Sequence, residues 1–254
     1  MSRTPTAMVR TLRSGAHNLL PRTTILLYGR EAALLNQTLN NLRRQLHGEC
    51  AVFVLADNPR IQSADLLPAT WPRTLPLVHV QPNIPCGKAK LVNLALENVR
   101  GDYLLVLEAG DDPDHDLLSN LEYNLSRADD ETVGQYGDLE LWDNNASPPR
   151  HIRTCRGERT ASRRRLLARL GKQTWIAPPL LRLDAVKRVG GYPTDYPGEG
   201  RLLADTALYL RLLRQGRLNY DPDLSIRRMY HPNRRLRQDE SNLLQVLLRL
   251  QKKR

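Results

Sequence analysis

Five acidic residues follow directly on an apolar run in the stretch LLVLEAGDDPDHDLL, positions 104–118. They are Glu108, Asp111, Asp112, Asp114 and Asp116, with Gly110 among them. Carboxylate oxygens are the ligands that hard divalent cations prefer, so the stretch raises the question of what this acidic cluster holds. We interpret the last three of these acids as solvated residues or as residues at the start of a helix, near its N-terminal dipole.

The elements around the cluster are predicted from the hydrophobic pattern. Apolar runs indicate buried strands at 23–28, 51–55, 77–80 and 103–107, and helical periodicity indicates helices at 31–47, 87–99 and 113–127. Nearly continuous apolar strands that alternate with helices are typical of a parallel sheet covered on both faces. We therefore predict an α/β fold with a mostly parallel central sheet flanked by helices.

Two acidic segments stand at the carboxyl ends of these strands. Asp57 follows one strand in the stretch ADNP, and Glu108 follows another at the start of the acidic cluster. Ligands of such sheets bind beyond the carboxyl ends of the strands, so we expect Asp57 and the cluster to share one crevice. The second half is less regular, with a strand expected at 139–142, a helix at 203–215 and an edge strand at 218–220.

The composition is that of a globular protein. The chain has 254 residues, of which 41% are hydrophobic and 26% charged, and no apolar run reaches the length of about 18–20 residues that a membrane helix requires. The first residues lack the apolar stretch of a secretory signal. The three cysteines, Cys50, Cys86 and Cys155, lie far apart and fit free thiols in a reducing cytosol. We therefore expect a cytoplasmic protein.

The net charge of +11 attracts polyanions such as nucleic acid, anionic lipid or phosphorylated substrates. Residues 150–172 hold nine Arg or Lys against one Glu, and are either a solvated loop or a surface that meets phosphate or anionic lipid. The tail at 241–254 is apolar on one face and basic on the other. This tail fits a helix docked on its own domain, an interfacial helix on an anionic bilayer, or a contact in a homodimer.

Seven short segments occur in an order that is similar to that of a known family. They are LLYGRE, LADNP, NIPCGKAKLVNLAL, GDYLLVLEAGDDPDHDLL, LLRLDAVKRVGGYPTDY, LLADTALYLRLLRQG and MYHPN. Together they resemble the family 2 glycosyltransferases of GT-A fold. The resemblance implies a single Rossmann-like GT-A domain at 23–235. Outside it we expect a basic N-terminal extension at 1–22 and a basic amphipathic C-terminal helix at 236–254.

The resemblance also implies the reaction and its residues. A sugar passes from a nucleotide-sugar donor to an alcohol acceptor with inversion at the anomeric carbon, and Asp205 is the expected base that removes the acceptor's proton. The residues expected to bind the nucleotide sugar are Tyr28, Arg30, Asp57, Lys88, Asn93 and Glu108. The residues expected near the acceptor are Trp175, Gly191 and Tyr192.

A divalent cation usually neutralises the leaving diphosphate in this family, held at an Asp-x-Asp signature. Here the three signature positions read Glu108, Ala109 and Gly110, so the third offers no side chain. We expect Mg²⁺ or Mn²⁺ to be held by Glu108, Asp111 and His231. In the alternative, the cation is weak or absent and basic side chains take over the neutralisation of charge.

We predict an inverting hexosyl- or N-acetylhexosaminyltransferase, with a UDP-sugar favoured as donor over dTDP- or GDP-sugars. Its expected acceptor is a bacterial cell-surface glycan or lipid-linked acceptor, such as lipopolysaccharide core, O-antigen or capsule, met by a peripheral protein at the inner face of the membrane.

The alternative is a non-catalytic module that binds glycan or nucleotide and scaffolds a partner, because Gly29, Ala56, Gly110 and Ala204 each replace a family side chain. Nucleic acid is disfavoured as a partner, since only 5% of residues are aromatic and no nucleic-acid motif occurs.

Overall fold

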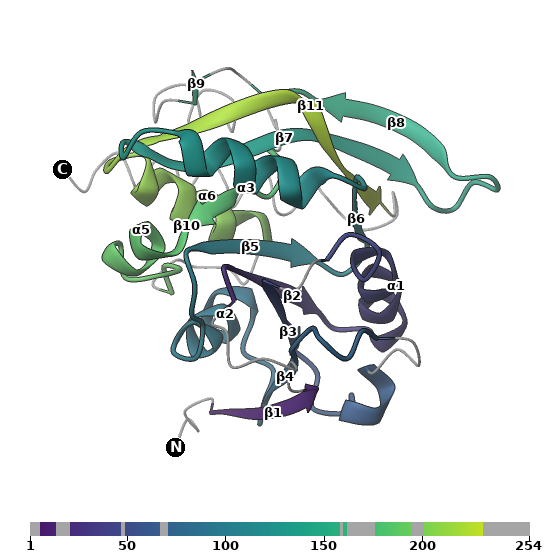
Figure 1. Cartoon of the computed structure of the whole chain (residues 1–254). Helices are drawn as coiled ribbons and strands as arrows, with labels where there is room; N and C mark the ends of the chain where they lie inside the picture. Colours follow the sequence, from purple (N-terminus) through teal and green to yellow (C-terminus); the bar gives the residue numbers. More distant parts are fainter. Residues whose placement is uncertain are drawn as a thin grey trace.

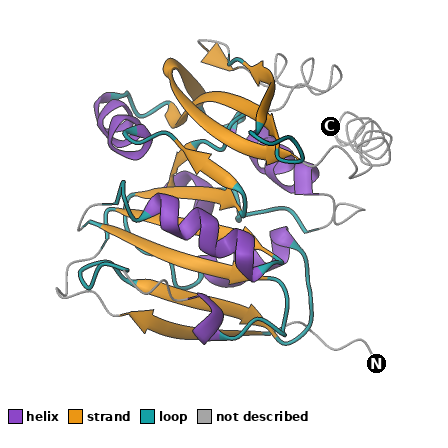
Figure 2. Cartoon of the chain, turned by 90° about the vertical axis from the view of Figure 1, so that its right-hand side faces the viewer, coloured by secondary structure: helices purple, strands orange, loops and turns teal. Residues whose placement is uncertain are grey.

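The computed structural model describes residues 6–13, 21–46, 49–66, 71–157, 160–161, 176–194 and 201–230. Within these ranges the strands join into one sheet, and helices lie on both of its faces (Figures 1 and 2). Trp175, His231 and the expected helix at 236–254 lie outside the described residues.

Four parallel strands form one half of the sheet, in the order β4-β3-β2-β5. Their bounds are β2 Thr23–Gly29, β3 Cys50–Ala56, β4 Leu77–Pro82 and β5 Tyr103–Glu108. All four strands were predicted from their apolar runs, which arise because both faces of this part of the sheet are covered. Within the segment expected as an N-terminal extension, β1 (Ala7–Arg13) pairs antiparallel with β4 and lengthens this half of the sheet.

The other half of the sheet mixes strand directions. From β5 the order continues through β10 (Leu180–Arg182), β7 (Thr132–Asp143), β11 (Arg217–Tyr230) and β6 (Asp111–Pro113). The long strands β7 and β11 run parallel to each other, whereas β10 and β6 are antiparallel to their neighbours. In addition, β8 (Arg150–Cys155) pairs with β7 in a hairpin that projects from the body in Figure 1, and β9 (Thr160–Ala161) pairs with β11.

Two predictions for this half were wrong. The helix expected from Pro113 begins instead at Leu117, as α3 (Leu117–Arg127), because the preceding residues Asp111–Pro113 pair with β11 as strand β6. The expected edge strand at 218–220 is instead the start of β11 and lies between β7 and β9. Both errors have one cause, since the pairing partners of these short segments lie far away in the sequence.

The helices divide into two layers. On one face of the sheet, α1 (Ala32–Leu42), the short 3₁₀ helix η1 (Ser63–Leu66) and α3 pack on alternate residues of the strands. On the other face, α2 (Lys88–Leu96), α5 (Leu183–Arg188) and α6 (Arg201–Leu212) pack on the residues between them. Side chains alternate along a strand, so Glu108 is directed to the same face of β5 as Val106, toward α2 and α6.

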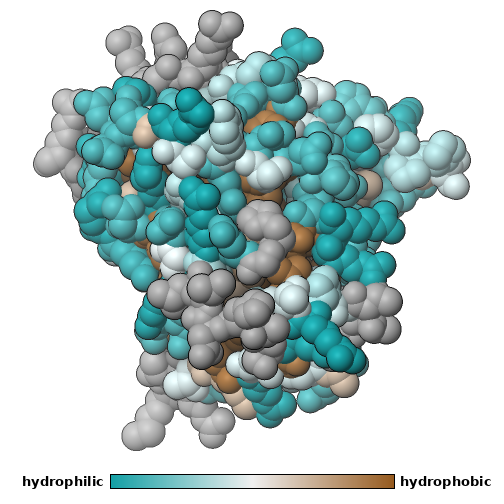
Figure 3. Space-filling model, viewed as in Figure 1, coloured by the Kyte–Doolittle hydropathy of each residue, from teal (hydrophilic) through white to brown (hydrophobic). Residues whose placement is uncertain are grey.

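Among the described residues, the large hydrophobic side chains that stay exposed are Met8, Val9, Ile84, Tyr123 and Ile152. No helix among the described residues has the length and apolar character that a membrane span requires. The face seen in Figure 3 is mostly hydrophilic, with hydrophobic residues in small patches. The apolar side chains are therefore concentrated in the two layers on either side of the sheet.

Candidate active site

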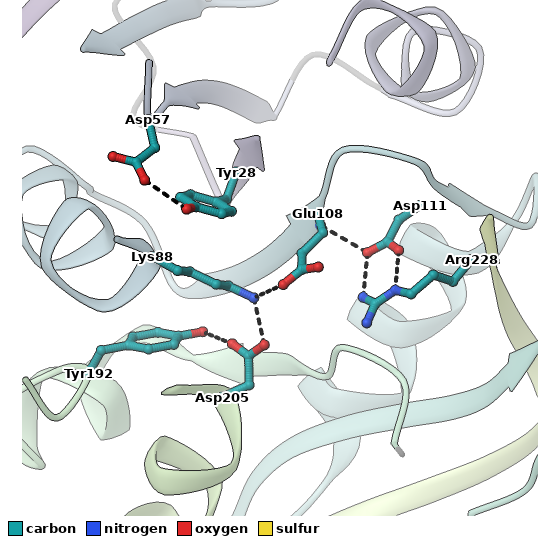
Figure 4. Close-up of polar contacts among 8 residues, drawn as sticks. All are labelled: Tyr28, Asp57, Lys88, Glu108, Asp111, Tyr192, Asp205 and Arg228. Atoms are coloured by element: carbon teal, nitrogen blue, oxygen red, sulfur yellow. Dashed lines mark hydrogen bonds and ion pairs between the residues drawn. The ribbon is translucent and has the colours of Figure 1, made fainter. Parts of the chain in front are cut away.

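Three residues from different elements meet at the carboxyl end of β5. Glu108 is the last residue of β5, Lys88 is the first residue of α2, and Asp205 lies in α6. The ammonium nitrogen of Lys88 lies 3.1 Å from Oε1 of Glu108 and 2.5 Å from Oδ2 of Asp205 (Figure 4). The Lys88 side chain is only 2% exposed, whereas that of Asp205 keeps 19% of its surface accessible.

The charges in this cluster shift one another's pKa values. Burial lowers the pKa of Lys88, but Asp205 and Glu108 raise it by more, so the side chain stays an ammonium ion. Burial raises the pKa of Asp205, and the Lys88 ammonium offsets only part of that rise. A carboxylate with a raised pKa is the better proton acceptor, so this position suits a general base.

Tyr192 reaches the same carboxylate from the turn after α5. Its hydroxyl group donates a hydrogen bond to Oδ1 of Asp205 at 2.8 Å, and burial raises its pKa, so the hydroxyl remains a neutral donor. The residue was expected near the acceptor, but it is only 2% exposed, so its ring is buried. Its observed contact is with the expected base instead.

Asp57 follows β3, as predicted, and its carboxylate is surrounded by donors from this chain. It accepts hydrogen bonds from the Tyr28 hydroxyl at 2.9 Å and from the Arg30 guanidinium at 3.0 and 2.8 Å. The backbone N–H groups of Cys86 and Gly87 also donate to it, at 2.8 and 3.3 Å. The side chain has 0% exposure, so Asp57 fixes the end of β2 to the loop before α2.

Sequence reasoning missed Arg228, a residue of β11. Its guanidinium donates to both oxygens of Asp111, from Nε to Oδ1 at 2.6 Å and from Nη2 to Oδ2 at 2.8 Å. The same Oδ2 also accepts a hydrogen bond from the backbone N–H of Glu108 at 2.9 Å. No local motif marks Arg228, because only the pairing of β6 with β11 brings it to Asp111.

The described residues do not fit the divalent cation that the resemblance implies. Gly110 supplies no side chain, the carboxylate of Glu108 pairs with Lys88, and that of Asp111 pairs with Arg228. Across the part of the chain that the structure describes, no group of three or more His, Cys, Asp or Glu is arranged to hold a metal.

Solved structures with a similar arrangement identify the fold. TarS 1–349 from S. aureus, in complex with UDP-GlcNAc, matches with a TM-score of 0.68 at 13% identity, over 89% of this chain and 65% of that one. The mannosyltransferase PcManGT from Pyrobaculum calidifontis, in complex with GDP-Man and Mn²⁺, matches with a TM-score of 0.53 at 18% identity, over 89% of this chain and 61% of that one. GalNAc-T7 with UDP, GalNAc and Mn²⁺ matches with a TM-score of 0.59 at 10% identity, over 85% of this chain and 45% of that one. The chain has the GT-A glycosyltransferase fold.

The GT-A fold was predicted from the sequence and is confirmed by these structures. Neither a family model nor a curated protein sequence matches the chain. At identities of 10–18% the likeness concerns the fold, and the chain spans less than two thirds of each of the three proteins. Membership of family 2 and inversion at the anomeric carbon stay predictions.

Proposed function

We propose that the protein transfers a sugar from a nucleotide-sugar donor to a hydroxyl group of an acceptor, with inversion at the anomeric carbon. The observation that carries this proposal is the contact of Asp205, Lys88 and Glu108 in one partly accessible cluster at the carboxyl end of β5. Sheets of this type bind their ligands at that edge. TarS was solved with UDP-GlcNAc and PcManGT with GDP-Man, which supports a nucleotide sugar here, with UDP favoured.

Asp205 is the proposed catalytic base. The acceptor oxygen forms a bond to the anomeric carbon while the bond from that carbon to the diphosphate oxygen breaks, and the acceptor's proton passes to the Asp205 carboxylate. The exposed part of this side chain gives the acceptor access to it. Its position on a helix supports the role, because a base held by regular structure keeps its direction better than one on a loop.

Lys88 is the proposed partner of the leaving diphosphate. Negative charge develops on the diphosphate as the bond breaks, and a buried ammonium stabilises such charge strongly. With the donor absent, that ammonium is shared between Glu108 and Asp205. If it turns to the diphosphate when the donor binds, the same movement leaves Asp205 free to accept a proton. In this proposal the Lys88 ammonium takes the role at the diphosphate that the resemblance assigns to a divalent cation.

Arg30 is the proposed contact to the nucleotide at the neighbouring strand end. Its side chain is 42% exposed, while the carboxylate of Asp57 holds its guanidinium from the buried side. Asp57 was predicted to bind the base or ribose directly. We propose instead that it positions Arg30 and Tyr28, because donors from this chain already surround both of its oxygens.

The acceptor is proposed to be a bacterial cell-surface glycan or a lipid-linked precursor of one, and the transferred group a hexosyl or N-acetylhexosaminyl unit. The net charge of +11 supports an anionic acceptor or membrane surface. Arg150 and Arg153 lie exposed on the projecting strand β8, where such a surface could approach them. A peripheral position at the inner face of the membrane would bring the enzyme to that acceptor.

The experiment that tests this function is release of nucleotide diphosphate from a panel of nucleotide sugars with candidate acceptors. We expect the variant Asp205→Asn to lose at least about 100-fold in turnover, since general base catalysis contributes that much or more. The matched control is Asp184→Asn, which changes an acid that is 63% exposed in α5 and should keep full turnover. Equal rates for wild type and Asp205→Asn would remove the base assignment.

A non-catalytic binding module is the second candidate. The observation in its favour is the tight pairing of the expected base with Lys88, together with a glycine at the third signature position. Calorimetry with the same nucleotide sugars separates the two. Donor binding without turnover by the wild type, over the full acceptor panel, would support the module and reject the enzyme.

A further inference from the structure

We propose that Asn93 and Tyr192 act as one positioning unit for the base Asp205, linking helix α2 to helix α6. This inference rests on the proposed function, because it assigns the supports of the base in that reaction. It reassigns two residues, since the sequence predicted a contact to the nucleotide sugar for Asn93 and to the acceptor for Tyr192.

Asn93 holds the backbone of Tyr192 with both ends of its amide group. Its Nδ2 atom donates to the carbonyl oxygen of Tyr192 at 2.8 Å, and the backbone N–H of Tyr192 donates to its Oδ1 atom at 2.8 Å. This reciprocal pair fixes the residue in position and direction, much as a short piece of β ladder would. The amide of Asn93 is therefore committed to the turn that carries Tyr192.

The two glycines before Tyr192 allow this close approach. Gly190 and Gly191 have φ angles of 76° and 73°, in the left-handed region that favours glycine. A Cβ atom at Gly191 would lie 2.6 Å from Oδ1 of Asn93, which is too close for any side chain. The two glycines thus allow the backbone of Tyr192 to lie against the side-chain amide of Asn93.

The Tyr192 hydroxyl then orients Asp205. Among the described residues, two donors hold this carboxylate, with Tyr192 on Oδ1 and Lys88 on Oδ2. The ammonium is the donor that must leave when it neutralises the diphosphate, so the neutral hydroxyl is the support that remains during proton transfer. A neutral donor keeps the carboxylate in place and weakens its basicity less than a cation does.

The test begins with Tyr192→Phe, which removes only the hydroxyl group. We expect kcat to fall at least about tenfold, a typical cost of a lost hydrogen bond to a charged group, while KM for the donor stays within about twofold. The matched control is Tyr220→Phe, because Tyr220 also donates its hydroxyl to an aspartate, Asp138, at 2.6 Å. That variant should keep its kcat. An unchanged kcat in Tyr192→Phe would overturn the inference.

Asn93→Asp is the second variant in this test. It keeps the size of the side chain and the acceptor for the Tyr192 N–H, but it removes the donor to the Tyr192 carbonyl. If both residues act through Asp205, the double variant Asn93→Asp/Tyr192→Phe should lose little more kcat than the worse single variant. A rise in the dissociation constant of UDP for Asn93→Asp would mean that Asn93 contacts the nucleotide, and losses of kcat that multiply would mean that the two residues act independently. Either result would overturn the inference.

A stability measurement keeps this inference separate from the proposed function. If the wild type turns over no donor, the proposed function fails, but the contact between Tyr192 and Asp205 can still be measured. In a urea-unfolding cycle of Tyr192→Phe, Asp205→Asn and the double variant, we expect the effects to be non-additive, as for residues in direct contact. Strict additivity would show that the hydrogen bond is absent in solution and would overturn the positioning role.

Discussion

The ammonium nitrogen of Lys88 lies 2.5 Å from Oδ2 of Asp205, although the two residues stand 117 positions apart in the chain. The same nitrogen lies 3.1 Å from Glu108, so one buried cation serves two carboxylates. Such a cation is costly to bury unless its partners stay charged, and its removal takes away the positive charge that offsets both carboxylates. Lys88 therefore links the residue that ends β5 to the proposed base on α6.

We expect Lys88→Met to weaken UDP binding at least about tenfold, because the diphosphate then meets the charges of Glu108 and Asp205 without the ammonium ion that offsets them. Isothermal titration calorimetry measures the effect directly, whether or not an acceptor is known. Lys90→Met is the matched control, since Lys90 lies on the same helix but is exposed, and it should change the affinity less than about twofold. Equal affinities for both variants would contradict the role of Lys88.

Asp57→Asn is expected to lower the free energy of unfolding by about 2–4 kcal/mol, because a neutral amide cannot accept all the donors that surround this buried carboxylate. The donors are two backbone N–H groups, the Tyr28 hydroxyl and the Arg30 guanidinium. Urea unfolding followed by circular dichroism measures the change. Asp102→Asn, at a side chain that is 70% exposed, should cost less than about 0.5 kcal/mol. A loss of similar size in both variants would mean that Asp57 is not an organising residue.

The sequence predicted the parallel half of the fold because burial on both faces leaves a direct mark. β5 reads as an apolar run since both layers of helices cover it, and the same holds for β2. By contrast, β8 has five exposed residues in succession and β6 is the polar triplet Asp-Asp-Pro. These strands exist because long partners pair with them, and no pattern within the segments themselves reports that pairing.

In the candidate site, too, some residues are marked by the local sequence and others are brought in only by the tertiary fold. Glu108 and Asp205 could be predicted, since a strand end and a family motif mark them. Arg228 could not, because it meets Asp111 only through the pairing of β11 with β6. Tyr192 was expected near the acceptor, whereas its buried hydroxyl group donates to the carboxylate of Asp205. The burial of a single tyrosine is not visible in a sequence.

His79 makes the stability of the protein depend on pH. It is buried on β4, its Nδ1 atom lies 2.9 Å from Oγ of Ser63, and its Nε2 atom has no partner among the described residues. Burial, and to a lesser extent Arg10, lowers its pKa from the ordinary value of 6.5 to about 4. Because the unfolded chain binds the proton more readily, the contribution of neutral His79 to stability is present above pH 6.5 and is lost as the pH falls toward 4.

We expect this loss to amount to about 2 kcal/mol between pH 7 and pH 5. The control is His79→Gln, which keeps a polar group for Ser63 but does not titrate. The free energy of unfolding of both proteins is measured at the two pH values, so that shifts from other groups cancel in the difference. If wild type and variant lose the same stability on acidification, His79 is not the titrating group.

Removal of divalent cations is expected to change the affinity for UDP by less than about threefold, because we propose that the Lys88 ammonium takes the place of the cation at the diphosphate. Glu108 and Asp111 are each paired with a basic side chain, and Gly110 leaves the third signature position without a ligand. The protein is stripped with a chelator, and UDP is titrated by calorimetry in chelator and then in excess Mn²⁺.

Lys88→Met is titrated in parallel, and here Mn²⁺ should increase the affinity, since the cation can occupy the place of the missing ammonium between Glu108 and Asp205. A tenfold loss of wild-type affinity in chelator would instead return Glu108, Asp111 and His231 to the role of metal ligands.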